Sequence, residues 1–287
     1  MTIKRASVMG HCMGVKRGID LALEAARTEG PVFSLGPLIH NPQAVAQLRD
    51  RGVEPLSEKE LDGRVDGKTV VIRAHGVAPE IRRRIAELGG RVVDATCPRV
   101  IASQQRAAAY AKRGWTVIIA GDRDHGEVAG IAGHAREASG SNDSWAVVGS
   151  PAEAETVSAS GSVAVIAQTT IREEEYRAIC AVLSRRFAVA EVVDSICPAT
   201  AERQRALADL AADCDAIVVV GGKNSANTRR LHAAARELGL RSWLIERPEE
   251  LPAEIYNFER VGLTAGASTP DSLVDEVEER LAAGPAL

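Results

Sequence analysis

Short apolar runs alternate along the chain with longer stretches that have helical spacing. The runs 116–120 and 216–220 are uniformly apolar or β-branched, and each ends at a glycine. Between such runs, for example over 15–27, apolar side chains recur every three or four residues, which is the period of an amphipathic helix. Buried strands that alternate with helices predict an α/β fold with parallel sheets. A short strand over 5–9 is expected to open the chain.

One phrase of this pattern occurs twice, 100 residues apart. Residues 92–98 and 192–198 both consist of a β-branched strand that leads into a cysteine and a proline. In both copies a glycine at the end of the next strand follows the cysteine by 24 residues, and the same spacing connects Cys12 to Gly36. The chain therefore contains three copies of one unit, which is the signature of an internal repeat.

The repeat divides the 287 residues into three small α/β units. Their predicted bounds are 14–97, 98–195, and a third unit formed by 1–13 with 196–287. Each unit is too small to be comfortable alone, so the three are expected to pack on one another. If they pack about a pseudo-threefold axis, the three cysteines and the polar residues beyond the strand ends converge, at the edge where open parallel sheets bind ligands.

The three repeated cysteines suggest a metal centre. They could be buried structural residues, but equivalent positions in three units favour a shared role. A closed zinc site normally has four ligands in short paired spacings, which are absent from this sequence. Three thiolates from distant segments suit a 4Fe–4S cluster with one open iron, which can act as a Lewis acid and deliver electrons. Cys180 and Cys214 have no repeat counterpart and are expected in the core.

Polar residues at equivalent strand ends form a set rich in hydrogen-bond donors. A donor-rich pocket at loops and helix N-termini is suited to an anion such as a phosphate or diphosphate. Glu127 is its only acid and therefore the candidate proton donor, although a solvated loop glutamate is the alternative. The set is His40, His75, His125, Glu127, Thr169, Ser225, Asn227 and Ser268.

Composition narrows the class of protein. The net charge of −4 and the aromatic content of 3% do not favour nucleic-acid or membrane-surface binding. No leader-like or membrane-spanning apolar run is present in the sequence. Five cysteines without secretory signals indicate a reducing compartment, so a cytoplasmic location is expected, with neither nucleic acid nor membrane as a partner.

Several stretches together resemble the 4-hydroxy-3-methylbut-2-enyl diphosphate reductase family of the non-mevalonate isoprenoid pathway. The resemblance covers nearly the whole chain. The stretches that carry it are Gly-Pro-Leu-Ile-His-Asn (36–41), Arg-Ala-His-Gly-Val (73–77), Asp-Ala-Thr-Cys-Pro (94–98), His-Gly-Glu (125–127), Gln-Thr-Thr (168–170), Ser-Ala-Asn (225–227) and Thr-Ala-Gly-Ala-Ser-Thr-Pro (264–270).

The resemblance implies a trefoil of three α/β units around a central 4Fe–4S cluster held by Cys12, Cys97 and Cys197. It also implies that Glu127, Thr169 and His125 are catalytic, with Thr169 near the substrate hydroxyl and Glu127 passing protons. The residues implied to bind the diphosphate substrate are His40, His75, His125, Thr169, Ser225, Asn227 and Ser268.

The family's reaction is a reductive dehydroxylation that yields isopentenyl and dimethylallyl diphosphates, with ferredoxin or flavodoxin as the usual electron donor. This sequence departs from the family's usual residues at His11, Met13, Gly126, Pro198 and Ala226. Two alternatives therefore stand beside the reductase. One is a paralogue with the same cluster and a different small anionic substrate, and the other is a non-catalytic redox sensor.

Overall fold

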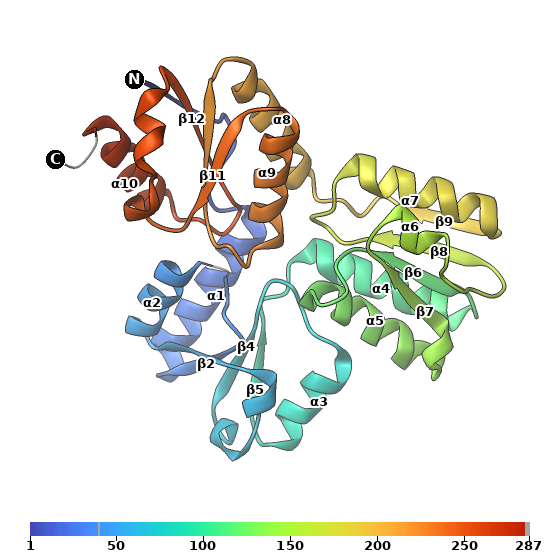
Figure 1. Cartoon of the computed structure of the whole chain (residues 1–287). Helices are drawn as coiled ribbons and strands as arrows, with labels where there is room; N and C mark the ends of the chain where they lie inside the picture. Colours follow the sequence, from blue (N-terminus) through green and yellow to red (C-terminus); the bar gives the residue numbers. More distant parts are fainter. Residues whose placement is uncertain (40, 285–287) are drawn as a thin grey trace. The chain divides into compact units, whose positions relative to one another are not determined.

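The computed structural model describes residues 1–39 and 41–284, and the chain divides into two compact units. The first unit comprises Met1–Lys16, Ile39–Asp50 and Pro198–Leu287, and the second comprises Arg17–Leu38 and Arg51–Cys197. In the described residues the strands form three four-stranded sheets, and every strand pair is parallel (Figure 1). The predicted α/β fold with small parallel sheets is thus confirmed. The bounds proposed for three repeat units stay a prediction.

The first unit contains one sheet, with the strand order β1-β12-β10-β11. Its edge strand β1 comes from the start of the chain and pairs with β12, with Thr2 opposite Arg260 and Arg5 opposite Leu263. The four strands are β1 (Thr2–Arg5), β10 (Ala216–Val220), β11 (Arg241–Ile245) and β12 (Arg260–Ala265). The helices that lie wholly within this unit are α2 (Pro42–Asp50), α8 (Pro198–Ala212), α9 (Ala226–Glu237) and α10 (Asp271–Ala282).

The second unit contains two sheets, ordered β3-β2-β4-β5 and β7-β6-β8-β9. Their strands are β2 (Val32–Leu35), β3 (Val53–Leu56), β4 (Thr69–Ile72), β5 (Arg91–Asp94), β6 (Thr116–Ala120), β7 (Trp145–Val148), β8 (Val163–Ala167) and β9 (Val189–Val193). The helices that connect them are α3 (Pro79–Glu87), α4 (Pro98–Lys112), α5 (Gly126–Ser139), α6 (Pro151–Ala154) and α7 (Glu173–Arg186). Helix α1 (Met13–Glu29) begins in the first unit and continues into the second.

Helices cover both faces of the sheet β7-β6-β8-β9, which is why its central strands β6 and β8 are almost entirely apolar. In β6 the side chain of Ile118 packs with Ile179 of α7, whereas that of Ile119 packs on the opposite face with Ile131 of α5. Figure 1 shows α7 on one side of this sheet and α4 with α5 on the other. Successive residues of a strand point to opposite faces, so a strand buried on both faces loses the apolar–polar alternation of a surface strand.

The first strand differs from its expected position. The predicted strand over 5–9 is wrong, because β1 covers Thr2–Arg5. The last backbone hydrogen bond that joins this segment to β12 runs from the N–H of Ala6 to the carbonyl of Leu263. The charged side chains of Lys4 and Arg5 obscured the strand in the sequence. They form surface ion pairs, Lys4 with Asp213 at 3.0 Å and Arg5 with helix α10.

One edge strand of each sheet was also not predicted from the sequence. Strands β3, β7 and β11 are short edge strands that are only partly buried, and β3 even contains Glu54 and Pro55. Each accepts a hydrogen bond from one of the three repeated glycines, which ties the second strand end of every unit to its edge strand. These bonds run from Gly36 to Leu56 (2.6 Å), from Gly121 to Val148 (2.9 Å) and from Gly221 to Ile245 (2.9 Å).

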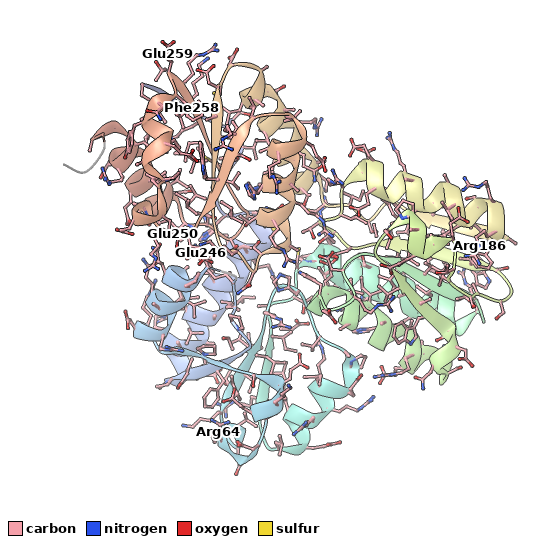
Figure 2. All side chains as sticks on the ribbon, viewed as in Figure 1. Arg64, Arg186, Glu246, Glu250, Phe258 and Glu259 are labelled. Atoms are coloured by element: carbon pink, nitrogen blue, oxygen red, sulfur yellow. The ribbon has the colours of Figure 1, made fainter. Side chains whose placement is uncertain are left out.

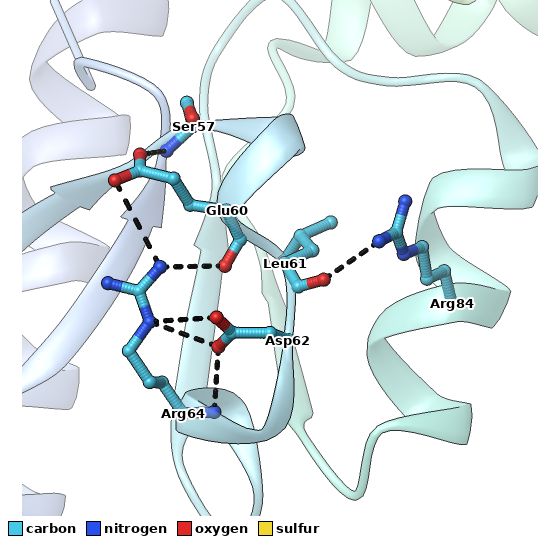
Figure 3. Close-up of polar contacts among 6 residues, drawn as sticks. All are labelled: Ser57, Glu60, Leu61, Asp62, Arg64 and Arg84. Carbon is cyan, nitrogen blue, oxygen red and sulfur yellow. Dashed lines mark hydrogen bonds and ion pairs between the residues drawn. The ribbon is translucent and has the colours of Figure 1, made fainter.

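The connection from β3 to β4 is a pair of 3₁₀ turns on the surface (Figure 3). Arg64 bonds the Asp62 carboxylate at 3.0 Å and the Glu60 carbonyl at 2.9 Å. Arg84 of α3 donates to the Leu61 carbonyl at 2.8 Å and so attaches this connection to the helix. The exposed Arg64–Asp62 pair contributes little to stability, because solvent screens it. The charged, glycine-containing stretch 62–67 is a surface turn.

Within the part of the chain that the structure describes, no helix has both the length and the apolar character needed to cross a membrane.

Asp94 organises the turn that leads to Cys97. Its carboxylate accepts hydrogen bonds from the backbone and hydroxyl of Thr96 and pairs with Arg82. Burial alone would raise the pKa of Asp94, but the Thr96 hydroxyl and the Arg82 guanidinium outweigh it and hold the pKa below its ordinary value.

We expect Asp94→Asn to lower the free energy of unfolding by about 1 kcal/mol at pH 7, after allowance for partial exposure. A lowered folded-state pKa contributes stability above the unfolded value, near pH 4, and this stability disappears as the pH falls through the folded value. Urea unfolding at pH 7 and at pH values below 4 should therefore show the gap between variant and wild type closing in acid. The repeat counterpart Asp194 is exposed, so Asp194→Asn is the matched control and should change little.

Candidate active site

Each repeated cysteine is held by the same backbone hydrogen bond. Its N–H donates to the carbonyl of the residue that lies two positions beyond the end of a neighbouring strand. The three bonds run from Cys12 to Ala267 beyond β12 (3.2 Å), from Cys97 to Ala74 beyond β4 (3.0 Å) and from Cys197 to Thr169 beyond β8 (2.8 Å). The three cysteines thus occupy equivalent places in their sheets, as their spacing in the sequence indicated.

Each of these cysteines also immediately precedes a helix. Helices α1, α4 and α8 begin at Met13, Pro98 and Pro198. The N-terminus of a helix favours negative charge, and the thiolate is the form of cysteine that binds metal. Within the described residues none of the three forms a disulfide, and all three are partly buried.

This donor set fits an iron–sulfur cluster held by three thiolates, each on a different iron. Cys12 lies in the first unit, whereas Cys97 and Cys197 lie in the second. Among residues 1–39 and 41–284, no three His, Cys, Asp or Glu side chains are grouped as a single metal ion would require.

The other two cysteines have the environment of structural residues. Cys214 is buried in the apolar cluster of α8, β10 and α9, and Cys180 packs against the cluster between β8 and α7. Burial raises the pKa of both thiols, which favours the uncharged form. Their environments agree with the core role expected for them.

Glu127 is a buried acid whose two carboxylate oxygens are both held by Thr169. The side chain of Glu127, in the first turn of α5, is only 1% exposed. Its Oε1 accepts the backbone N–H of Thr169 at 2.6 Å, and its Oε2 accepts the Thr169 hydroxyl at 2.9 Å. The carbonyl of Thr169 in turn accepts the N–H of Cys197. Acid, hydroxyl and cysteine are thereby connected through one residue.

Two histidines stand beside this acid. His125 is the N-cap of α5, and its Nδ1 accepts the backbone N–H of Glu127 at 3.2 Å. A neutral ring that accepts at Nδ1 carries its proton on Nε2, so His125 presents a donor there. The ring of His75, in the loop beyond β4, meets the His125 ring edge to face, with 5.0 Å between centroids. The second unit thus brings His75, His125, Glu127 and Thr169 together.

The remaining polar residues lie in the first unit. Ser225 is the N-cap of α9, and its Oγ accepts the backbone N–H of Thr228 at 3.3 Å. Asn227 and Ser268 are 6% and 7% exposed, and both Nδ2 of Asn227 and Oγ of Ser268 are buried without a hydrogen-bond partner among residues 1–39 and 41–284. A buried polar atom without a partner costs about 1–3 kcal/mol, and a ligand that accepts hydrogen bonds would remove that cost.

Two further residues of the first unit share this property and were not predicted. Asn41 is 1% exposed and caps α2 by accepting the Ala44 N–H at 2.9 Å, but its Nδ2 has no partner in the part of the chain that the structure describes. Thr228 is fully buried, and its Oγ1 has no partner in that part either. Asparagine before proline and a helix is a start signal that could have identified Asn41. No comparable signal marks Thr228. The predicted ligand His40 lies outside the described residues.

Lys223, in the loop after β10, is already bound to carboxylates. Its Nζ pairs with Glu250 at 2.6 Å, and its backbone N–H donates to Glu246 at 2.8 Å. Figure 2 shows both glutamates at this end of the sheet. Because Glu250 neutralises its charge, Lys223 is not assigned to the anion site.

A buried guanidinium lies against the backbone of the second unit's site. Arg73, at the end of β4, lies so close to Gly126 that a Cβ there would stand 2.6 Å from its Nη2, and its other amino group similarly faces Gly36. Burial lowers the pKa of Arg73, and Glu58 at 3.9 Å opposes that shift only in part. Gly126 therefore adjoins this guanidinium. The family that the sequence resembles usually has proline at this position.

Residues 3–282 match the model of a protein family described as LytB protein. The chain belongs to the LytB family. Among the curated LytB relatives, the 4-hydroxy-3-methylbut-2-enyl diphosphate reductase of Treponema denticola is 43% identical over 293 residues, which cover 99% of this chain and 100% of the relative. The reductase of the same name from Aquifex aeolicus is 37% identical and covers 95% of this chain and 93% of its own length.

Solved structures give the same result for the LytB fold. The E-1-hydroxy-2-methyl-but-2-enyl-4-diphosphate reductase of Plasmodium falciparum has a TM-score of 0.89 at 25% identity, over 97% of this chain and 87% of that one. A second structure, described as (E)-4-hydroxy-3-methyl-but-2-enyl diphosphate reductase, the terminal enzyme of the non-mevalonate pathway, has a TM-score of 0.69 at 37% identity. It covers 99% of this chain and 100% of its own.

Proposed function

We propose that this chain reduces 4-hydroxy-3-methylbut-2-enyl diphosphate to isopentenyl and dimethylallyl diphosphates. The observation that carries the proposal is the buried Glu127 carboxyl, fixed at both oxygens by Thr169, whose carbonyl binds the N–H of Cys197. A proton source is thereby attached to a cysteine at a strand end. The full-length relatives that bear the reductase name support the same activity.

The diphosphate would be bound by hydrogen-bond donors. Its oxygens are acceptors, and the buried donor atoms of Asn227 and Ser268 have no partner within the described residues. His125 offers Nε2–H, and the N-terminus of α9 favours an anion. The residues assigned to the diphosphate are His40, His75, His125, Ser225, Asn227 and Ser268, with Thr169 at the substrate hydroxyl.

The residues Cys12, Cys97 and Cys197 would hold a 4Fe–4S cluster. When bound, such a cluster supplies electrons and an open iron as a Lewis acid. A small electron carrier of the ferredoxin or flavodoxin type would deliver the electrons. Cysteines that form no disulfide within the described residues suit a reducing compartment such as the cytoplasm.

The reaction consumes two electrons and two protons. The allylic C–O bond breaks, one proton leaves with the oxygen as water, and the other is added to the carbon skeleton, where its position decides the product isomer. Glu127 is the group placed to hold a proton at its carboxyl oxygen. The Thr169 hydroxyl, which donates to Oε2, orients that carboxyl and can turn to the substrate hydroxyl.

The test is anaerobic turnover of the diphosphate alcohol with reduced viologen as the electron source. The matched control is dimethylallyl diphosphate, which carries the same anion but lacks the hydroxyl group. Oxidation of viologen by the alcohol alone supports the proposal. Oxidation by neither compound, in a protein with an intact cluster, would contradict it and favour a sensor or a different substrate.

A further inference from the structure

Arg203 is a buried cation that binds backbone next to two of the repeated cysteines. It lies on α8 and is only 3% exposed. Its Nη2 donates to the Gly10 carbonyl at 2.7 Å, and its Nη1 donates to the Ala199 carbonyl at 2.8 Å. Gly10 stands two residues before Cys12, and Ala199 stands two residues after Cys197. One guanidinium therefore binds the chain beside both cysteines.

The backbone at Gly10 depends on this kind of support. Gly10 has a φ of +74°, a left-handed conformation that leaves its carbonyl outside regular hydrogen bonding. Its carbonyl is bound by Arg203, and the Cys12 N–H that follows is bound by Ala267. These two bonds, both within the first unit, hold the segment that presents the Cys12 thiol.

The positive charge of Arg203 lies at the same segment, because its Nη2 is bonded to the Gly10 carbonyl at 2.7 Å. The carboxylate of Asp271, at the start of α10, also lies against Gly10. Asp271 is exposed to solvent and Arg203 is not, so the field of the cation is screened less.

A cluster beside Cys12 gains one negative charge when it takes up an electron. Net charge and hydrogen bonding around an iron–sulfur cluster set its reduction potential. A fixed, buried positive charge stabilises the reduced form more than the oxidised form and therefore raises the potential. The same charge on a solvent-exposed side chain has little effect.

We propose that Arg203 is a positioning residue for the Cys12 segment and that its buried charge raises the reduction potential of the cluster. The proposal deepens the proposed function and rests on it for the presence of the cluster. Arg203 would thereby make the cluster easier to reduce, although it does not belong to the residues assigned to the substrate.

The test is an anaerobic redox titration of the reconstituted protein, with dithionite as reductant and the paramagnetic signal of the one-electron-reduced cluster as readout. In R203Q we expect the ratio of reduced to oxidised cluster at a fixed potential to fall about tenfold, a shift of about 59 mV for a one-electron couple. R203K keeps the charge and should keep the wild-type potential, with some loss of cluster because its single amino group cannot bind both carbonyls.

Two further variants separate charge from structure. Arg205 lies on the same helix but is exposed, so R205Q should leave the potential unchanged. D271N removes a negative charge that is exposed to solvent, so it too should leave the potential nearly unchanged.

The outcomes distinguish the two proposals. R203Q with a full cluster and wild-type potential would overturn the role of Arg203, as would an equal fall in R203K and R203Q. If R203Q fails to fold, a fall of the potential in R203K, which keeps the charge, overturns that role instead. A wild-type protein that binds no iron would overturn the cluster itself.

Discussion

Replacing Glu127 with glutamine is expected to lower turnover at least about a hundredfold while the fold is retained. A positioned general acid typically contributes 10²–10⁴-fold, and glutamine has no acidic proton to give. Its Oε1 can still accept the Thr169 N–H, and the Thr169 hydroxyl can rotate to accept from the new amide, so the local geometry survives. Turnover per cluster, with iron content measured on the same sample, is the quantity to compare.

The matched control is Glu137→Gln on the same helix. Glu137 is exposed and pairs with Arg83 on the surface, so its loss should leave turnover within about twofold of wild type. If E127Q turned over as fast as E137Q, Glu127 would not be the proton donor. A redox sensor has no use for this acid, so a signal that survives in E127Q would favour that alternative.

Replacing any one of the three repeated cysteines with serine is expected to remove the cluster, and with it all turnover. A cluster held by only three thiolates has no spare ligand. Reconstituted C97S should therefore lose the visible absorption, the iron and the labile sulfide of the wild-type protein. C12S and C197S should behave in the same way, because the backbone holds all three cysteines equivalently.

Cys180 and Cys214 provide the internal controls. Their thiols are packed against apolar clusters, so C180S and C214A should keep the full iron and sulfide content, at a stability cost of a few kcal/mol at most. If C97S retained as much iron as C180S, Cys97 would not be a ligand of the cluster. A colourless wild-type protein without labile sulfide would point to a mononuclear metal instead.

The strand ends that carry the candidate site could be predicted from the sequence, because the repeat has a fixed spacing. Parallel strands end at one edge of their sheet, so equal offsets from Cys12, Cys97 and Cys197 correspond to equivalent strand ends. The central strands β6, β8 and β10 were predicted at their observed bounds because they are buried on both faces. The edge strands β3, β7 and β11 were not predicted, because a partly buried strand of four or five residues shows no clear pattern of apolar and polar positions.

Contacts between distant side chains could not be predicted. The bond from Arg203 to Gly10 joins residues 193 positions apart, and nothing in the sequence near either one indicates it. The pairing of Glu127 with Thr169 spans 42 positions and depends on the register of β6 and β8. Likewise, Thr228 is polar in a helix like many exposed threonines, and only its burial marks it out.

The most direct test of the reductase assignment is product analysis of a single anaerobic turnover. Reconstituted protein would receive limiting 4-hydroxy-3-methylbut-2-enyl diphosphate and excess reduced viologen. We expect two viologen equivalents to be oxidised per substrate consumed, with isopentenyl and dimethylallyl diphosphates together accounting for the carbon. Unchanged substrate in the presence of an intact, reducible cluster would contradict the reductase assignment.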